Sequence, residues 1–292
     1  MINKFSSKTT IITAVIVVSI GAISIVWADK AKKREIAEQE EQLRLEQIEI
    51  QKEIERNKPI VGAKEESVKK HGYDSRLIAN KLNTYDYSNN GDKMVFLTFD
   101  DGPSTTNTPG VLDILNKHNV KGTFFIKGNS LEKEGADKIL KRTFNEGHSI
   151  AHHSYSHDYN YLYPNRTLNI DNFANEIAKT DKAIKNVLGE KFSSNVLRCP
   201  GGHMSWKNMD PLDKHLEEKD MVSIDWNALN ADAEGKKKNS DALFEYTKKT
   251  SENKDIVVLL MHDTYGKEET VKSLDQIITH FKDSGYSFKI LV

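Results

Sequence analysis

The strongest constraint on the fold is a regular alternation of apolar and amphipathic segments beyond residue 92. Six short apolar runs have the length and composition of buried strands, at residues 94–99, 122–126, 149–152, 195–197, 221–226 and 256–261. Six longer segments with helical periodicity alternate with them, at residues 109–118, 133–145, 169–188, 211–219, 240–250 and 268–282. This order predicts an α/β fold whose parallel strands are joined by helical crossovers, either as a barrel or as a doubly wound sheet.

Polar side chains collect directly after several of the predicted strands. They are Asp100 and Asp101, His153 and His157, Arg198, Asp232, and His262. In a closed barrel of parallel strands the carboxyl ends converge on one face, and active sites lie on that face. The sequence therefore predicts that these residues form one site.

The segment from His153 to His157 has the spacing of a metal site. Two histidines four positions apart lie on one side of a helical turn, and with a carboxylate they leave positions on a zinc ion for water and substrate. The adjacent Asp100 and Asp101 offer one ligand and one base, although aspartate is also common in solvent-facing turns.

A second histidine pair, His148 and His152, has the same spacing but lies in a segment that we expect to be extended. Residues four positions apart in a strand are separated by about 13 Å, which is too far for one ion. We therefore expect His148 and His152 to have structural roles or to support the metal ligands from behind.

Five motifs, in order along the chain, resemble those of the NodB-type polysaccharide deacetylases, carbohydrate esterase family 4. They are TFDDG at 98–102, GHSIAHHSYSH at 147–157, RCPGG at 198–202, Trp226-Asn227 with Asp232, and Leu260-Met261-His262. The resemblance covers roughly residues 93–292. It implies a distorted (β/α) barrel of the NodB-homology type and metal-dependent hydrolysis of N-acetyl groups.

The resemblance also implies roles for individual residues. The metal, Zn²⁺ or another divalent ion such as Co²⁺ or Mn²⁺, would be held by Asp101, His153 and His157. Asp100 would act as the general base, and Arg198 would orient it. His262 would act as the general acid, with its pKa raised by Asp232.

The same resemblance implies a substrate-binding part of the site. The backbone N–H of Gly201 would stabilise the oxyanion, and Trp226 and Leu260 would wall a pocket for the acetyl methyl group, although core packing is the alternative for both. Three positions depart from the family pattern. Gly201 and Ala233 stand where aromatic residues are usual, and His152 replaces a more usual asparagine. These departures affect substrate fit and leave the ligands, base and acid in place.

An apolar run near the N-terminus predicts a membrane anchor. Residues 9–28 carry no charge, and at about 1.5 Å per residue they span roughly 30 Å as a helix, the thickness of a bilayer core. Lys4 and Lys8 precede the run, so the positive-inside rule places residues 1–8 in the cytoplasm and the rest of this single-pass chain outside the cell. The alternative is a signal peptide cleaved after Ala28, which would give a secreted protein.

Residues 29–58 predict a solvated helical stalk, because they are charge-dense, lack Gly and Pro, and are rich in helix formers. Ile36, Leu43 and Ile50 recur every seven residues, but the accompanying seam positions are mostly polar. We therefore expect at most weak self-association through a coiled coil. Residues 59–92 are expected to be a linker that ends in a polar stretch, so we place the deacetylase domain at 93–292.

Composition and the predicted location limit the classes of partner and substrate. The 42 basic and 43 acidic residues give a net charge of −1, whereas a nucleic-acid-binding protein carries a basic surplus. The single cysteine, Cys199, excludes a disulfide framework, and we expect it to be a buried filler. An exported, membrane-held enzyme would reach the cell wall, so we expect peptidoglycan as the substrate. Chitin, poly-N-acetylglucosamine and acetylated xylan are alternatives, as is a catalytically silent glycan-binding homologue.

Overall fold

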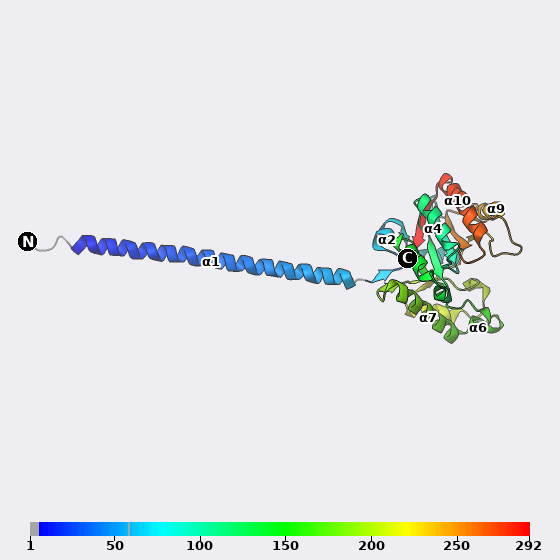
Figure 1. The fold of residues 1–292 in the computed structure, drawn as a ribbon, viewed down its shortest axis with the longest axis horizontal. Coiled ribbons are helices and arrows are strands. Elements are labelled where there is room, and N and C mark those ends of the chain that lie inside the picture. The colour runs from blue at the N-terminus through cyan, green and yellow to red at the C-terminus, as the bar shows by residue number, and fades with distance from the viewer. Residues whose placement is uncertain (1–5, 58) are drawn as a thin grey trace, which may run out of the picture. The chain divides into compact units, whose positions relative to one another are not determined.

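The computed structural model describes residues 6–57 and 59–292, with side chains described for residues 27, 29–54 and 59–292. The chain divides into two units, Met1–Lys58 and Pro59–Val292. The helix of the first unit is α1 (Ser6–Asn57), which includes nearly all of the predicted stalk (Figure 1). Its described side chains are exposed, including those of Ile36, Leu43 and Ile50.

Within the part of the chain whose side chains are described, no helix is both long enough and apolar enough to cross a membrane. The predicted anchor at residues 9–28 lies outside that part, apart from Trp27. The predicted tail at residues 1–8 also lies outside it.

The second unit is built on a curled sheet of parallel strands (Figure 1). The strands follow one another in the order β9 (Ala228–Leu229), β10 (Ile256–His262), β3 (Met94–Asp100), β4 (Thr123–Ile126), β5 (Ser149–His152), β7 (Val196–Leu197) and β8 (Val222–Ser223). Beside β4, β3 also pairs with β11 (Ser287–Leu291), which pairs in turn with β2 (Gly72–Tyr73). The predicted α/β class and parallel sheet are confirmed, and the sheet forms a half-barrel, consistent with the predicted barrel.

Helices surround this half-barrel (Figure 1). The six long ones lie close to the predicted segments and are α4 (Thr108–Lys117), α5 (Ala136–Asn145), α7 (Ile170–Leu188), α8 (Asp210–Glu218), α9 (Ser240–Ser251) and α10 (Glu268–Asp283). The side chains of Asn169 and Asn239 cap the first turns of α7 and α9 by accepting backbone N–H groups. The shorter elements are α2 (Glu65–His71), α3 (Ser75–Asn83), α6 (Tyr159–Leu162), the 3₁₀ turns η1 (Gly128–Glu132), η2 (Pro164–Arg166) and η3 (His203–Ser205), and the strand pair β1 (Ile60–Val61) with β6 (Phe192–Ser193).

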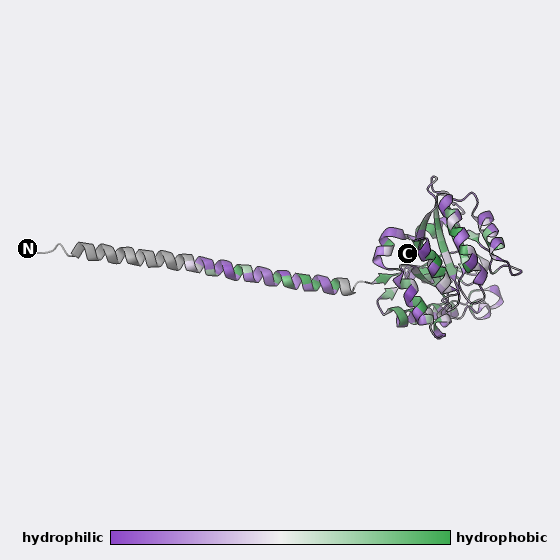
Figure 2. Ribbon diagram, turned by 45° about the horizontal axis from the view of Figure 1, so that its top comes forward, coloured by the Kyte–Doolittle hydropathy of each residue, from purple (hydrophilic) through white to green (hydrophobic). Residues whose placement is uncertain are grey.

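The strands separate two apolar layers, because successive side chains point to opposite faces of a sheet. The layer under the outer helices includes Val95, Leu97 and Phe99 of β3 and Val257, Leu259 and Met261 of β10. The cluster inside the half-barrel includes Met94, Phe96, Ile256 and Val258 of the same two strands. Figure 2 shows these strands as largely hydrophobic and much of the helical surface as hydrophilic. We call the inward-facing residues of β3 and β10 the inner rows, and the open end of the half-barrel at the carboxyl ends of the strands its mouth. Asp100 and His262 are the last residues of the two inner rows, so both side chains lie at the mouth.

The predicted linker, residues 59–92, belongs to the folded unit, which begins at Pro59 and not at residue 93. Helix α3 places Ile78, Ala79 and Leu82 in the inner cluster. The carbonyl of Tyr87 also accepts the backbone N–H groups of Asp255 and Ile256, at the start of β10. The sequence did not reveal this because the elements are short and their apolar positions are filled by partners far along the chain.

We predict that Ile78→Ala lowers the free energy of unfolding by about 2–5 kcal/mol, because it leaves a cavity in the inner cluster. Urea unfolding followed by tryptophan fluorescence measures the change. Leu77→Ala is the matched control, because Leu77 is the next residue on α3 but is 56% exposed. It should change the stability by no more than about 0.5 kcal/mol. Equal effects of the two variants would show that the buried face of α3 does not stabilise the inner cluster.

Candidate active site

The arginine that follows β7 forms the centre of a buried hydrogen-bond network. Arg198 is fully buried, and its Nη1 donates to Asp100 Oδ1 at 2.8 Å and to Thr98 Oγ1 at 2.7 Å. Its Nε and Nη2 donate to the carbonyls of Ile224 and Asp225 at 3.0 and 3.1 Å. The guanidinium therefore connects the end of β3 to the segment after β8, and it fixes the direction in which the Asp100 carboxylate points.

Beside Asp100, three side chains converge as metal ligands would. One ligand atom from each of Asp101, His153 and His157 lies within 4.8 Å of the other two. The Nε2 atoms of His153 and His157 are 3.8 and 3.7 Å from Asp101 Oδ1. That oxygen is buried and has no hydrogen-bond partner within the described protein. A buried, unpaired carboxylate oxygen facing two imidazole nitrogens fits a divalent cation.

Both imidazoles direct Nε2 toward Asp101. His153 Nδ1 lies 2.8 Å from the carbonyl oxygen of Arg198, and a carbonyl only accepts, so Nδ1 is the donor in this bond and Nε2 is the ring nitrogen left for a metal. Burial, with His153 beside it, lowers the pKa of His157 to about 4. Near neutral pH the His157 ring therefore does not have to lose a proton before it can bind a metal.

A carboxylate that we did not predict from the sequence shapes the turn between these two histidines. Glu176, on α7, is only 2% exposed, and its Oε2 accepts the backbone N–H groups of Tyr155 at 2.9 Å and Ser156 at 2.5 Å. The same oxygen accepts the Ser156 hydroxyl at 2.9 Å. Within the turn, Ser154 Oγ accepts the N–H of His157 at 3.1 Å. These bonds hold the turn in the shape that directs both rings toward Asp101.

A second ionisable pair lies across the mouth, on β10. His262 is the register partner of Asp100 in the ladder of β10 and β3. Its Nδ1 is 2.7 Å from Asp232 Oδ1, while Asp232 Oδ2 accepts the His262 N–H at 2.8 Å and the Thr270 hydroxyl at 2.6 Å. Burial lowers the pKa of His262, but the hydrogen bond to Asp232 and its charge outweigh this effect and raise the pKa to about 9. His262 is therefore protonated near neutral pH.

The residues predicted to bind substrate lie around this mouth. Gly201 has φ +76°, and its backbone N–H donates to no acceptor in the described part of the chain. Trp226 lies against Gly202, where an added Cβ would be 2.9 Å from the indole, and it also packs on the inner cluster. Leu260 is 7% exposed and precedes His262 by two positions on β10. Core packing, the alternative to a substrate-binding role, therefore accounts for part of the contacts of Trp226. Cys199 is fully buried, as predicted.

The other histidine pair does not join the metal-ligand group. His148 Nδ1 accepts the N–H of Gly122 at 3.1 Å, and burial lowers the pKa of His148 to about 3. His152, the last residue of β5, is buried, and its Nε2 lies 3.6 Å from Asp181 Oδ1 on α7. Both positions fit the structural roles expected for these residues.

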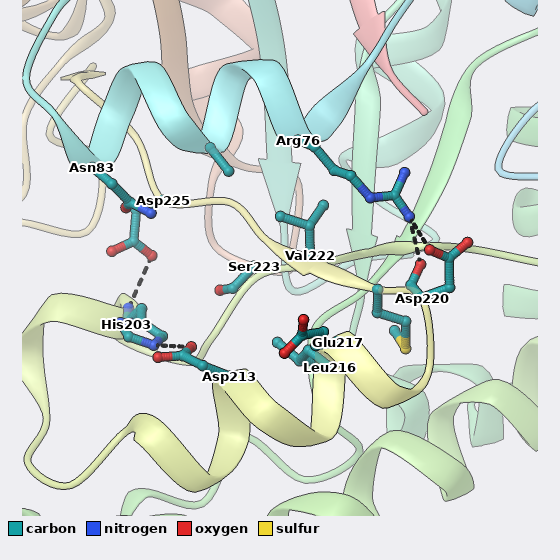
Figure 3. Close-up of a pocket in the computed structure, with 12 residues that line it drawn as sticks. Arg76, Asn83, His203, Asp213, Leu216, Glu217, Asp220, Val222, Ser223 and Asp225 are labelled. Carbon is teal, nitrogen blue, oxygen red and sulfur yellow. Dashed lines mark hydrogen bonds and ion pairs between the residues drawn. The ribbon is translucent and has the colours of Figure 1, made fainter.

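The loop after Arg198 is supported from behind by two carboxylates at a hollow of about 450 Å³ between α3 and α8 (Figure 3). Asp225 accepts the backbone N–H groups of His203 at 2.9 Å and Met204 at 3.3 Å. The His203 Nε2 atom is 2.7 Å from Asp213 Oδ1 (Figure 3). These contacts fix the loop that contains Gly201.

Comparisons with known proteins agree with this geometry. The family model for polysaccharide deacetylase matches residues 87–215. The peptidoglycan-N-acetylglucosamine deacetylase PgdA of Listeria monocytogenes is 34% identical over 197 residues, which are 67% of this chain but only 37% of that relative. A peptidoglycan-N-acetylglucosamine deacetylase of Bacillus cereus is 34% identical over 68% of this chain and 66% of the relative. A solved structure of a Streptococcus mutans CE4 esterase, 34% identical, superposes with a TM-score of 0.74 over 80% of this chain and 98% of that chain.

We predict that His153→Ala removes high-affinity metal binding, because it takes away one of three converging ligands. Titration of metal-free protein with zinc against a chromophoric chelator measures the dissociation constant. His148→Ala is the matched control, since His148 is equally buried but lies outside the ligand group, and it should keep most of the affinity. Loss of zinc in the His148 variant alone would overturn the ligand assignment.

Proposed function

Because the chain belongs to the polysaccharide deacetylase family, carbohydrate esterase family 4, we propose that it removes N-acetyl groups from an N-acetylglucosamine-containing glycan of the cell envelope, with peptidoglycan as the first choice. The observation that carries the proposal is the meeting, in one mouth, of a metal-ligand group, an arginine-held carboxylate and a carboxylate-held imidazolium. The names of the Listeria and Bacillus cereus relatives support peptidoglycan over other glycans.

The ligand group fits zinc, because two imidazoles and one carboxylate are a common protein ligand set for catalytic zinc and leave a coordination position open. Other divalent ions, such as Co²⁺ or Mn²⁺, accept the same ligands. When bound, the ion would supply Lewis-acid polarisation of the amide carbonyl and a lowered pKa of the attacking water.

The side chains around that group would carry the proton transfers. Asp100 takes a proton from the attacking water, and Arg198 keeps its carboxylate aimed. The N–H of Gly201, which has no acceptor among the described residues, donates to the substrate oxygen as negative charge develops there. His262, with Asp232 stabilising its charge, then protonates the departing nitrogen as the C–N bond breaks. The products are acetate and a free amino group on the sugar.

The N-terminal part of the chain would bring this activity to the cell surface. We place residues 9–28 in the membrane, because the run is uncharged and long enough to span it. The exposed α1 side chains of residues 29–54 suit a solvated stalk with weak self-association at most. Cleavage after Ala28 would instead release the enzyme outside the cell.

We predict that the purified full-length protein releases acetate from N-acetylated peptidoglycan, that a chelator abolishes the release, and that zinc restores it. Acetate and new amino groups are measured in parallel on peptidoglycan, chitin oligomers, poly-N-acetylglucosamine and acetylated xylan, so the preferred glycan is read from the rates. Glycan binding without acetate release from any of the four would instead identify a catalytically silent homologue.

We predict a bell-shaped pH profile whose alkaline limb follows deprotonation of His262, because only the imidazolium can donate a proton. Removing the charge of Asp232 lowers the pKa of His262 from about 9, so Asp232→Asn should move the alkaline limb to lower pH and reduce kcat. Asp100→Asn should cost far more activity. Both variants should keep their metal, because the ligand group is intact. An unmoved alkaline limb in Asp232→Asn, or metal loss in Asp100→Asn, would contradict these roles.

A further inference from the structure

Three aromatic rings form a row that runs from the protein interior to the edge of the mouth. Tyr163 stacks on Trp206 with ring centres 4.0 Å apart and planes 7° from parallel. Trp206 contacts Tyr159 with ring centres 5.1 Å apart. Tyr159 in turn lies 5.1 Å, centre to centre, from the ring of His157, a residue of the metal-ligand group. We call Tyr163, Trp206 and Tyr159 the aromatic row.

Exposure changes steeply along the aromatic row. Tyr163 is 2% exposed and belongs to the apolar cluster around α7 and α8, whereas Tyr159 is 43% exposed. Tyr159 is thus partly exposed to solvent beside the metal-ligand group. Ligand sites are lined largely by hydrophobic and aromatic side chains, so a partly exposed tyrosine beside the metal-ligand group is a candidate wall for a ligand.

The segments that carry the exposed end of the row are fixed before any ligand arrives. Tyr159 begins α6, whose first turn is capped by Asp158 Oδ1, which accepts the N–H of Asn160 at 2.9 Å. Trp206 Nε1 donates to the carbonyl of Pro200 at 2.8 Å. The loop before Trp206 is held by the contacts of Asp225 and Asp213 described above (Figure 3). A rigid aromatic side chain loses little conformational entropy when a ligand packs on it.

The position of Tyr159 relates it to the reacting acetyl group. A Cβ added to Gly201 would lie 3.3 Å from the Tyr159 hydroxyl oxygen, so this tyrosine lies beside the residue that carries the proposed oxyanion donor. On its other side lies the ring of His157. A sugar unit packed on Tyr159 would therefore adjoin the unit whose acetyl group is hydrolysed.

We infer that Tyr159 is a substrate-binding residue whose ring packs against the C–H face of a pyranose unit next to the one deacetylated. The inference rests on the proposed function, because it takes the ligand to be a β-linked N-acetylglucosamine chain. In that sugar the polar substituents lie around the rim of the ring, so its two faces present C–H groups to an aromatic surface. Trp206 and Tyr163 position Tyr159 from behind.

The test measures binding separately from turnover. Binding of N-acetylglucosamine pentamer to the full-length chain is measured by isothermal titration calorimetry in the Asp100→Asn background, which keeps the ligand group but should not consume the pentamer. Adding Tyr159→Ala should weaken binding by about tenfold. Tyr159→Phe keeps the ring and should stay within about twofold of the parent, since the stacking surface is unchanged.

Tyr161→Ala is the matched control, because Tyr161 is 38% exposed on the same helix but is not part of the aromatic row. It too should bind within about twofold of the parent. With Asp100 restored, Tyr159→Ala should raise KM for the pentamer by about tenfold and leave kcat nearly unchanged, because it removes binding shared by the ground and transition states.

Several outcomes would overturn the inference: no measurable pentamer binding by the parent, equal affinities of parent and Tyr159→Ala, an equal loss in Tyr161→Ala, or a loss in Tyr159→Phe as large as in Tyr159→Ala. Failure of the proposed function looks different. If the wild-type chain releases no acetate while pentamer binding still depends on the Tyr159 ring, hydrolysis is refuted and the sugar-binding role of Tyr159 stands.

Discussion

The site depends on one buried guanidinium. The charge of Arg198 is balanced by Asp100 at 2.8 Å, and the guanidinium also donates to Thr98 and to two carbonyls. Its Cζ lies 4.1 Å from the ring centre of Phe125. Its own carbonyl accepts His153 Nδ1, so the same residue orients both the candidate base and one metal ligand. A buried ion pair of this kind adds little net stability, but removing either partner leaves an uncompensated charge in the core. The arginine therefore matters chiefly because it fixes geometry.

Strand register carries that geometry around the mouth. Because β10 and β3 run parallel with His262 opposite Asp100, the candidate acid and base arise at the same height on neighbouring strands. On the same inward-facing side of these strands, the buried side chains of Phe96 and Val258 lie deeper in the half-barrel. The side chains of Asp100 and His262 therefore cannot turn into the core without displacing packed groups. Two further carboxylates complete the arrangement. Asp232 holds His262, and Glu176 holds the turn between His153 and His157.

The long helices, the main strands and the polar residues that follow those strands could be predicted from the sequence. The long helices and the main strands repeat apolar residues at the period of their own structure, and polar residues after the strands lie together because parallel strands end on one face. The elements it did not reveal, α3 and β11 among them, are short or depend on distant partners, as Ile78 does. Glu176 was missed for a related reason. On a polar, amphipathic helix it resembles any solvent-facing glutamate, and only the fold places it over a turn 20 residues away.

The way the chain enters the folded unit has a mechanical consequence. The first residues of Pro59–Val292 form β1, where Ile60 donates its N–H to the Lys191 carbonyl at 3.0 Å and Gly62 to the Ser193 carbonyl at 2.8 Å. The Gly62 carbonyl accepts the N–H of Ile150, near the amino end of β5. Any tension arriving along the polypeptide from before Pro59 is thus borne first at the ends of α7 and β5 remote from the metal-ligand histidines. Pulling on the chain would therefore load the base of the half-barrel before its mouth.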